Sequence, residues 1–105
     1  MFLVTQKTLS YYGTPTVLST ARSKPAATST KDNAIFAGGS DYNTTNAVYS
    51  VVDAYNKTLT RTTATALTTP RCHIGAASND NYAIFAGGRF DSVFTECSLV
   101  DVYDN

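Results

Sequence analysis

Hydrophobic and polar positions along the chain follow the short periods of β-strands. Apolar and β-branched residues occur in brief runs, and clusters of Gly, Asn, Asp and Lys separate these runs. Between Val52 and Tyr55 the side chains alternate, with Val52 and Ala54 predicted on one face and Asp53 and Tyr55 on the other. No segment shows the 3.6-residue apolar spacing of a helix. The pattern therefore predicts an all-β fold.

This pattern occurs twice. Aligning residues 16–39 with residues 65–88 gives 12 identities in 24 positions at an offset of 49, whereas chance gives roughly one or two. The stretch Ala-Ile-Phe-Ala-Gly-Gly at 34–39 returns unchanged at 83–88. Val-Asp-Ala-Tyr at 52–55 matches Val-Asp-Val-Tyr at 100–103 at an offset of 48, and Lys-Thr-Leu at 7–9 matches 57–59 at an offset of 50. The chain therefore contains an internal repeat of about 50 residues.

Each repeat is predicted to form a four-stranded antiparallel sheet. The first repeat covers 16–63, the second covers 64–105 without a fourth strand, and residues 1–15 lead into the first. The expected strands are 22–28, 34–37, 49–55 and 58–63, then 71–78, 82–86 and 98–103. In the leading segment, residues 2–5 align with the end of a third strand and 8–12 with a fourth. The repeats are thus out of phase with the chain.

The order of residues in each repeat resembles the Kelch repeat of β-propellers. An Arg, a run of small residues, an apolar strand, Gly-Gly, a variable loop and Val-Asp-x-Tyr follow one another in both copies. The resemblance covers essentially the whole chain and implies two propeller blades. One departure is that family members usually carry a Trp after this Tyr, and the chain has no Trp. Leu9 and Leu59 are the expected replacements in packing.

Two blades do not close a ring, because propellers use roughly four to eight. We expect the chain to associate with itself head-to-tail, with residues 8–12 pairing with 98–103 of a neighbour. A trimer of six blades is the first choice and a tetramer the second. The alternatives are a piece of a longer repeat protein and an open two-sheet sandwich.

Charge and hydropathy exclude several classes of partner. Lys and Arg total 8 and Asp and Glu total 8, so a general binder of nucleic acid or of anionic membranes is not expected. No apolar run is long enough to span a membrane. The first seven residues are too short and too polar for a signal peptide, which makes a cytoplasmic location the default expectation.

Arg22 and Arg71 are the first candidate binding residues. They occupy the same place in the two repeats, before the strands predicted to be innermost. In a closed ring their guanidinium groups would surround the channel and hold a small anion or carboxylate. The alternative is structural, in which each Arg bonds to carbonyl groups or to an Asp of the next blade. Asp53 and Asp101 are expected as inter-strand partners, with the same structural alternative.

The loops after the Gly-Gly pairs are the second candidate. They differ most between the repeats, and recognition in repeat proteins is often placed in such loops. An aromatic and arginine contact patch is predicted there, formed by Tyr42, Arg89, Phe90 and Phe94. The alternative is that Phe90 and Phe94 cap the sheet.

No catalytic, metal or cofactor motif is recognisable. Cys72 and Cys97 lack a metal-ligand spacing, and the predicted strands place them two strands apart, which is too far for a disulfide. If residue 73 lies in a strand, Cys72 and His73 point to opposite faces. We therefore expect a non-catalytic scaffold that binds a protein or a glycan. The alternatives are a carbohydrate-active or other enzyme with a site at the ring axis formed by Arg22, Arg71 and His73, and a fragment of a larger bacterial or phage surface repeat protein.

Overall fold

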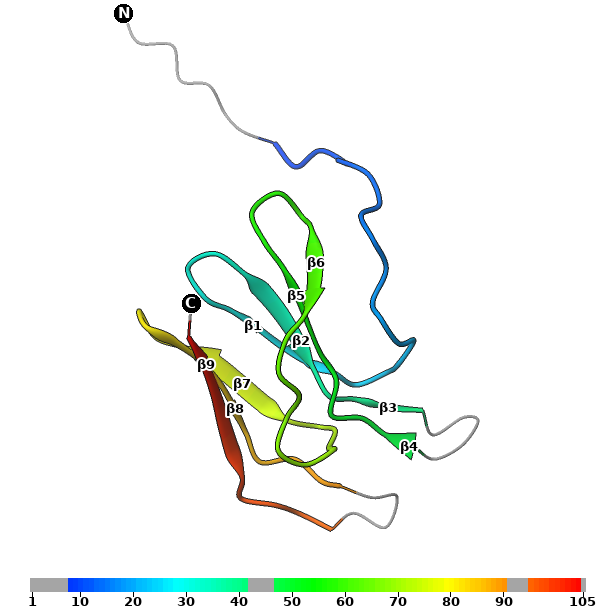
Figure 1. Cartoon of the computed structure of the whole chain (residues 1–105), viewed down its shortest axis with the longest axis vertical. Coiled ribbons are helices and arrows are strands. Elements are labelled where there is room, and N and C mark those ends of the chain that lie inside the picture. Colours follow the sequence, from blue (N-terminus) through cyan, green and yellow to red (C-terminus); the bar gives the residue numbers. More distant parts are fainter. Residues whose placement is uncertain (1–7, 42–46, 91–94, 105) are drawn as a thin grey trace, which may run out of the picture.

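The computed structural model describes residues 8–41, 47–90 and 95–104, and it is all-β over these ranges. Three antiparallel sheets contain all the strands of the described residues (Figure 1). The first sheet has the order β1-β2-β5-β6, the second is the two-stranded pair β3-β4, and the third has the order β7-β8-β9. The bounds are β1 Ala26–Ser29, β2 Ala34–Ala37, β3 Ser40–Asp41, β4 Ala47–Val48, β5 Val52–Tyr55, β6 Arg61–Thr63, β7 Gly75–Ser78, β8 Tyr82–Ala86 and β9 Val100–Asp104.

The first and third sheets repeat the same strand pairing. Ala26 faces Ala37 across β1 and β2, and Gly75 faces Ala86 across β7 and β8. Phe36 faces Asp53 in the first sheet, and Phe85 faces Asp101 in the third. The sequence repeat is therefore also a structural repeat. The second predicted strand of each repeat is confirmed, because β2 and β8 have the predicted bounds.

The first predicted strand of each repeat begins later than expected. β1 starts at Ala26 rather than Arg22, and β7 starts at Gly75 rather than at residue 71. The reason is a left-handed residue at the same place in both copies, Lys24 with φ 55° and His73 with φ 55°. A left-handed residue interrupts an extended strand, so the chain bends before the sheet begins.

The third and fourth strands are also shorter than predicted. The segment expected as one strand from residue 49 begins only at Val52, as β5, and β4 of the β3-β4 pair already ends at Val48. The β3-β4 pair itself was not predicted. β9 begins at Val100, two residues later than expected. β6 begins only at Arg61 because the turn before it is longer than two residues.

That turn is built by Asn56. Its side-chain oxygen accepts hydrogen bonds from the backbone N–H groups of Thr58 and Thr60, both at 3.0 Å, and Leu59 adopts φ 62°. Leu59 consequently points outward and is 40% exposed, while Leu9 is fully exposed. The expectation that these two leucines replace a packed Trp is wrong for this chain.

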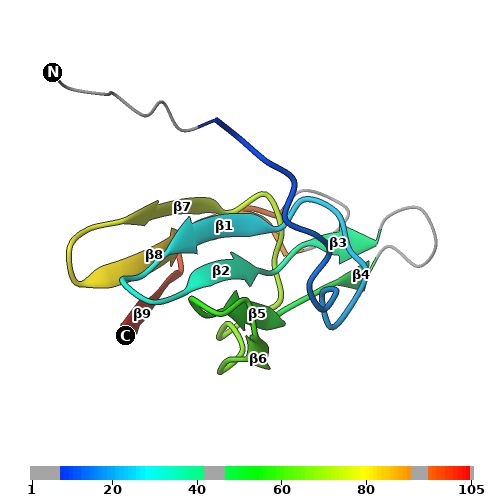
Figure 2. The same ribbon diagram turned by 90° about the horizontal axis from the view of Figure 1, so that it is seen from above.

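The core lies between the first and third sheets. Figure 2 shows β1 beside β7, with the other strands of each sheet following in the same direction, and β1 also contacts β8. One face of the first sheet packs against the opposite face of the third. The buried apolar residues are Ala26, Ile35, Ala37, Val52 and Ala54 from the first sheet, and Leu67, Ala83 and Phe85 from the second repeat.

The described part of the leading segment forms no strand. Tyr11 is 84% exposed and Tyr12 is 89% exposed, and no backbone pairing joins residues 8–12 to a described strand. Residues 2–5 lie outside the described residues. Within this single chain the predicted fourth-strand segment at 8–12 is therefore unpaired.

Candidate functional site

All three nitrogen atoms of the Arg71 guanidinium group bond to residues of the third sheet or of the loop that follows β8 in the same repeat. Its Nε donates to the carbonyl of Gly87 at 2.9 Å, and Nη2 donates to the carbonyl of Phe85 at 3.1 Å. Nη1 forms an ion pair with Asp101 Oδ2 at 2.8 Å. The residue has no exposed surface. All of these partners belong to the second repeat.

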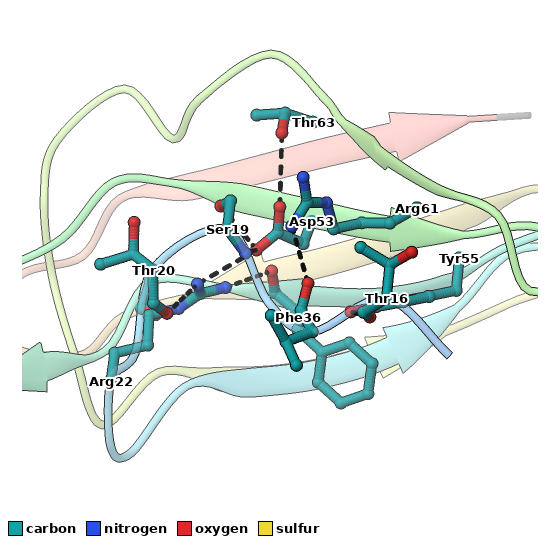
Figure 3. Close-up of polar contacts among 11 residues, drawn as sticks. Thr16, Ser19, Thr20, Arg22, Phe36, Asp53, Tyr55, Arg61 and Thr63 are labelled. Atoms are coloured by element: carbon teal, nitrogen blue, oxygen red, sulfur yellow. Dashed lines mark hydrogen bonds and ion pairs between the residues drawn. The ribbon is translucent and has the colours of Figure 1, made fainter. Parts of the chain in front are cut away.

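Arg22 makes the same contacts one repeat earlier. Its Nε and Nη2 donate to the carbonyls of Gly38 at 2.6 Å and Phe36 at 3.1 Å. Its Nη1 lies 3.1 Å from Asp53 Oδ2, and Figure 3 shows the guanidinium directed at this carboxylate. The Arg22 and Asp53 side chains have no exposed surface. The side chain of each Arg thus bonds within its own repeat, and among the described contacts neither reaches an Asp of the neighbouring repeat.

The Asp and Tyr of the Val-Asp-x-Tyr motif also hold the segment before each Arg. Asp53 Oδ2 accepts from the backbone N–H of Ser19 at 3.0 Å and from its hydroxyl at 2.9 Å (Figure 3). Tyr55 donates its hydroxyl to the carbonyl of Thr16 at 2.7 Å. The second repeat has matching bonds, from Thr68 to Asp101 and from Tyr103 to the Thr65 carbonyl. The motif therefore fastens residues 16–20 and 65–69 across the sheets.

Hydrogen bonding outweighs burial at the Asp53 carboxylate. Burial alone would raise its pKa, but the hydrogen bonds from Ser19 and Arg22 and the charge of Arg22 hold the pKa below its ordinary value. The ionised carboxylate of Asp53 is thus stabilised by partners inside the protein, namely Ser19 and Arg22. The structural alternative predicted from the sequence is that each Arg bonds to carbonyl groups or to an Asp of the next blade. The structure shows the carbonyl bonds, but it pairs each Arg with the Asp of its own repeat. A ligand at Arg71 would have to displace the bonds described above.

The described loop candidates, Arg89 and Phe90, lie at one end of the third sheet. Tyr42 and Phe94 fall outside the described residues. Arg89 is half-buried, forms backbone bridges with Cys72 and Glu96, and places Nη2 3.4 Å from His73 Nε2. Phe90 is half-buried, and its backbone N–H donates to the carbonyl of Thr95 at 3.2 Å. The structure therefore brings Arg89 and Phe90 into the loop base as neighbours.

A shallow open hollow at this end is lined by residues that were not predicted from the sequence to lie together. It has a volume of about 320 Å³ and is lined by His73, Gly88, Arg89, Glu96 and Cys97. His73 reaches it because of its left-handed backbone. Burial, followed by the charges of Arg89 and Lys24, lowers the pKa of His73. The second repeat thus has an imidazole that favours its neutral form beside an arginine.

The left-handed conformation of His73 also overturns the expectation for Cys72. Cys72 Sγ lies 3.2 Å from His73 Nδ1, whereas a strand would have placed the two side chains on opposite faces. Cys72 and Cys97 are both free thiols, and Arg89 bridges to Cys72 on one side and to Glu96 on the other.

Within 8–41, 47–90 and 95–104, no group of three or more His, Cys, Asp or Glu side chains is arranged to hold a metal ion. The same ranges contain no helix long and apolar enough to cross a membrane. Arg71 is buried while His73 is exposed, so the two do not share one surface.

Comparison with known proteins adds no assignment. The sequence matches no protein-family model, and no curated protein matches it.

Proposed function

We propose that the chain is a non-catalytic binding scaffold whose two large sheets act as Kelch-like propeller blades. The observation that carries this proposal is the equal use of Arg22 and Arg71. Each donates to the carbonyls of the second strand and the first Gly, and each pairs with the Asp of the third main strand. Residues with identical internal partners in both repeats support a framework role rather than chemistry.

Recognition is proposed in the loops that follow the Gly-Gly pairs. The strand pair β3-β4 follows Gly39, and Arg89 and Phe90 follow Gly88, so both loops leave the sheets at corresponding points (Figure 1). The framework is repeated while these loops differ in sequence. A constant frame with variable loops is the usual arrangement of a recognition surface. The expected partner is a protein or a glycan.

Arg89 provides the test of this surface. Screening the chain against arrays of glycans and of peptides identifies a ligand for the measurement. Arg89→Ala is then expected to weaken binding of this ligand about five- to thirtyfold, because truncating a contact arginine costs about 1 to 2 kcal/mol. Lys31→Ala is the matched control, since Lys31 is exposed in the turn between β1 and β2 at the other end of the sheet. Equal weakening by both variants, or none by Arg89→Ala, would contradict the proposed surface.

A further inference from the structure

In the contact between the two repeats, Leu67 and Arg71 take part in three backbone hydrogen bonds. The N–H of Gly39 donates to the carbonyl of Arg71 at 3.0 Å, and the N–H of Arg71 donates to the carbonyl of Tyr49 at 3.1 Å. The N–H of Leu67 donates to the carbonyl of Ser50 at 2.9 Å. Arg71 and Leu67 belong to the second repeat, and the other three residues belong to the first. We call the side of a repeat that carries Leu67 and Arg71 its front, and the side that carries Gly39, Tyr49 and Ser50 its rear. These bonds therefore join the rear of the first repeat to the front of the second.

Both ends of the chain carry the matching halves of this contact. The front of the first repeat has Leu18 and Arg22 where the second has Leu67 and Arg71. The rear of the second repeat has Gly88, Cys97 and Ser98 in the places of Gly39, Tyr49 and Ser50. This correspondence is supported by a matching hydrogen bond, because the N–H of Tyr49 donates to the Gly39 carbonyl and the N–H of Cys97 donates to the Gly88 carbonyl. The N–H groups of Leu18, Arg22 and Gly88 and the carbonyls of Arg22, Cys97 and Ser98 have no hydrogen bond to another described residue.

Burial of the central strands alternates in opposite phase in the two sheets. In β2, Ile35 and Ala37 are buried, at 4% and 0% exposure. In β8 the buried residues are instead Ala83 and Phe85, which correspond to Ala34 and Phe36 of β2. Each of the two large sheets therefore has two apolar faces. Within the described residues, the rear face of the first sheet and the front face of the third cover each other, and the other two faces stay open.

The open rear face of the third sheet is apolar. Val100 is 57% exposed and Val102 is 52% exposed, while their counterparts Val52 and Ala54 are 0% and 7% exposed. The difference arises because the second repeat covers Val52 and Ala54, and no described segment covers Val100 and Val102. Figure 1 shows this face turned away from the first sheet, with the leading segment on the opposite side of the molecule.

The edge of the third sheet is open as well. In the first sheet β5 pairs with β6, and Tyr55 faces Arg61. Among the described residues β9 has no such second neighbour. The residues that align with β6 are Tyr11–Gly13, at the offset of 50 that relates Lys57-Thr58-Leu59 to residues 7–9. These residues are exposed in the single chain.

We propose that a second copy of this chain docks its front, Leu18, Arg22 and Phe36, on the rear face of the third sheet and repeats the contact between the two repeats. Its residues 11–13 then pair with the open edge of β9. The contact is heterologous, because it joins two different surfaces of the chain. Repeating the rotation that relates one copy to the next closes a ring, with three copies preferred and four as the next choice. Failure of the loops to bind a ligand would leave this contact untouched.

Complementation between two variants tests the proposal. Leu18→Asp places a charge on the front and Val100→Asp places one on the rear, and both side chains lie outside the buried core, so each chain keeps its fold. Each variant alone is expected to sediment as a monomer. Their mixture is expected to form a 1:1 dimer, because the intact rear of the first variant accepts the intact front of the second. Circular dichroism checks that both variants are folded.

The control is Val17→Asp, the neighbour of Leu18. Val17 is 77% exposed, and its counterpart Ala66 stays exposed although Leu67 is buried between the repeats. Val17→Asp is therefore expected to assemble like the unaltered chain. A monomeric unaltered chain, an oligomer that Leu18→Asp leaves intact, or variants that do not combine on mixing would overturn the proposal.

Discussion

At the scale of single residues, the two Arg–Asp pairs explain why the repeat preserves these residue types. A buried guanidinium has five donors to satisfy. Both arginines donate to two corresponding backbone carbonyls and one carboxylate, and Arg22 donates to the Thr20 carbonyl as well. Replacing a complete buried pair by apolar residues is often neutral, but removing one partner leaves an unpaired buried charge. The members of each pair are therefore expected to depend on one another.

Asp53→Asn tests this dependence. The change leaves the Arg22 guanidinium buried without its counter-ion, and it is expected to lower the free energy of unfolding by about 3 to 5 kcal/mol. Asp32→Asn is the control, because the pair of Asp32 with Lys57 spans 3.3 Å and is 45% and 71% exposed. An exposed pair contributes about 0 to 1 kcal/mol. Urea unfolding measures both, and similar losses would contradict the assigned role of Asp53.

The pH dependence of stability follows from the same carboxylate. The pKa of Asp53 in the folded state lies below its ordinary value of 3.8, so the unfolded chain takes up this proton first as the pH falls. The contribution of Asp53 to stability is thus fully present above pH 3.8 and is lost as the pH falls through the folded pKa. Urea midpoints from about pH 5 downward are expected to fall less steeply for Asp53→Asn than for the unaltered chain. Equal slopes would contradict this assignment.

At the scale of elements, alternation and the Gly-Gly pairs predicted β2 and β8 to the residue, since apolar runs and turn residues are local signals. The starts of β1 and β7 could not be predicted, because Lys24 and His73 are left-handed without being glycine. That conformation also moved His73 next to Cys72 and into the hollow beside Arg89. Such a placement depends on tertiary packing and leaves no pattern in a single sequence.

The Gly-Gly pairs provide a prediction at this scale. Gly38 has φ 67°, and a Cβ there would collide with the Arg71 carbonyl and lie 2.7 Å from Ile74 Cδ1. Gly87 has φ 74°, but the nearest atom to its Cβ is the Cys97 carbonyl oxygen at 3.6 Å. Both alanine variants carry the left-handed strain of about 1 to 2 kcal/mol. Gly38→Ala is expected to lose about 1 to 3 kcal/mol more through the clash.

The comparison is made in the Leu18→Asp background, in which the chain is expected to be a monomer. Thermal and urea unfolding of Gly38→Ala and Gly87→Ala in that background measure the difference directly. Equal destabilisation would mean that the close approach of Arg71 to Gly38 does not hold the two sheets together. With Leu18 restored, Gly87→Ala is also expected to weaken assembly, because Gly87 would then meet the Arg22 carbonyl of the next copy.

At the scale of the whole molecule, the two ends of the chain complement each other. The front of the first repeat and the rear of the second carry the two halves of a contact that the chain already makes once internally. Val100 and Val102 are each more than half exposed on one sheet face, and this is the face on which we propose that a second copy docks. The sequence repeat predicted this incompleteness, whereas the opposite burial phase of β2 and β8 required the structure.

The mass of the native particle tests this account most directly. Native mass spectrometry of the unaltered full chain is expected to show a particle of three times the chain mass of 11.2 kDa, since three copies bring together six large sheets and bury every open face of these sheets. Four copies would keep the contact and change only the rotation between sheets. A particle that remains at the mass of one chain as its concentration is raised would contradict the account.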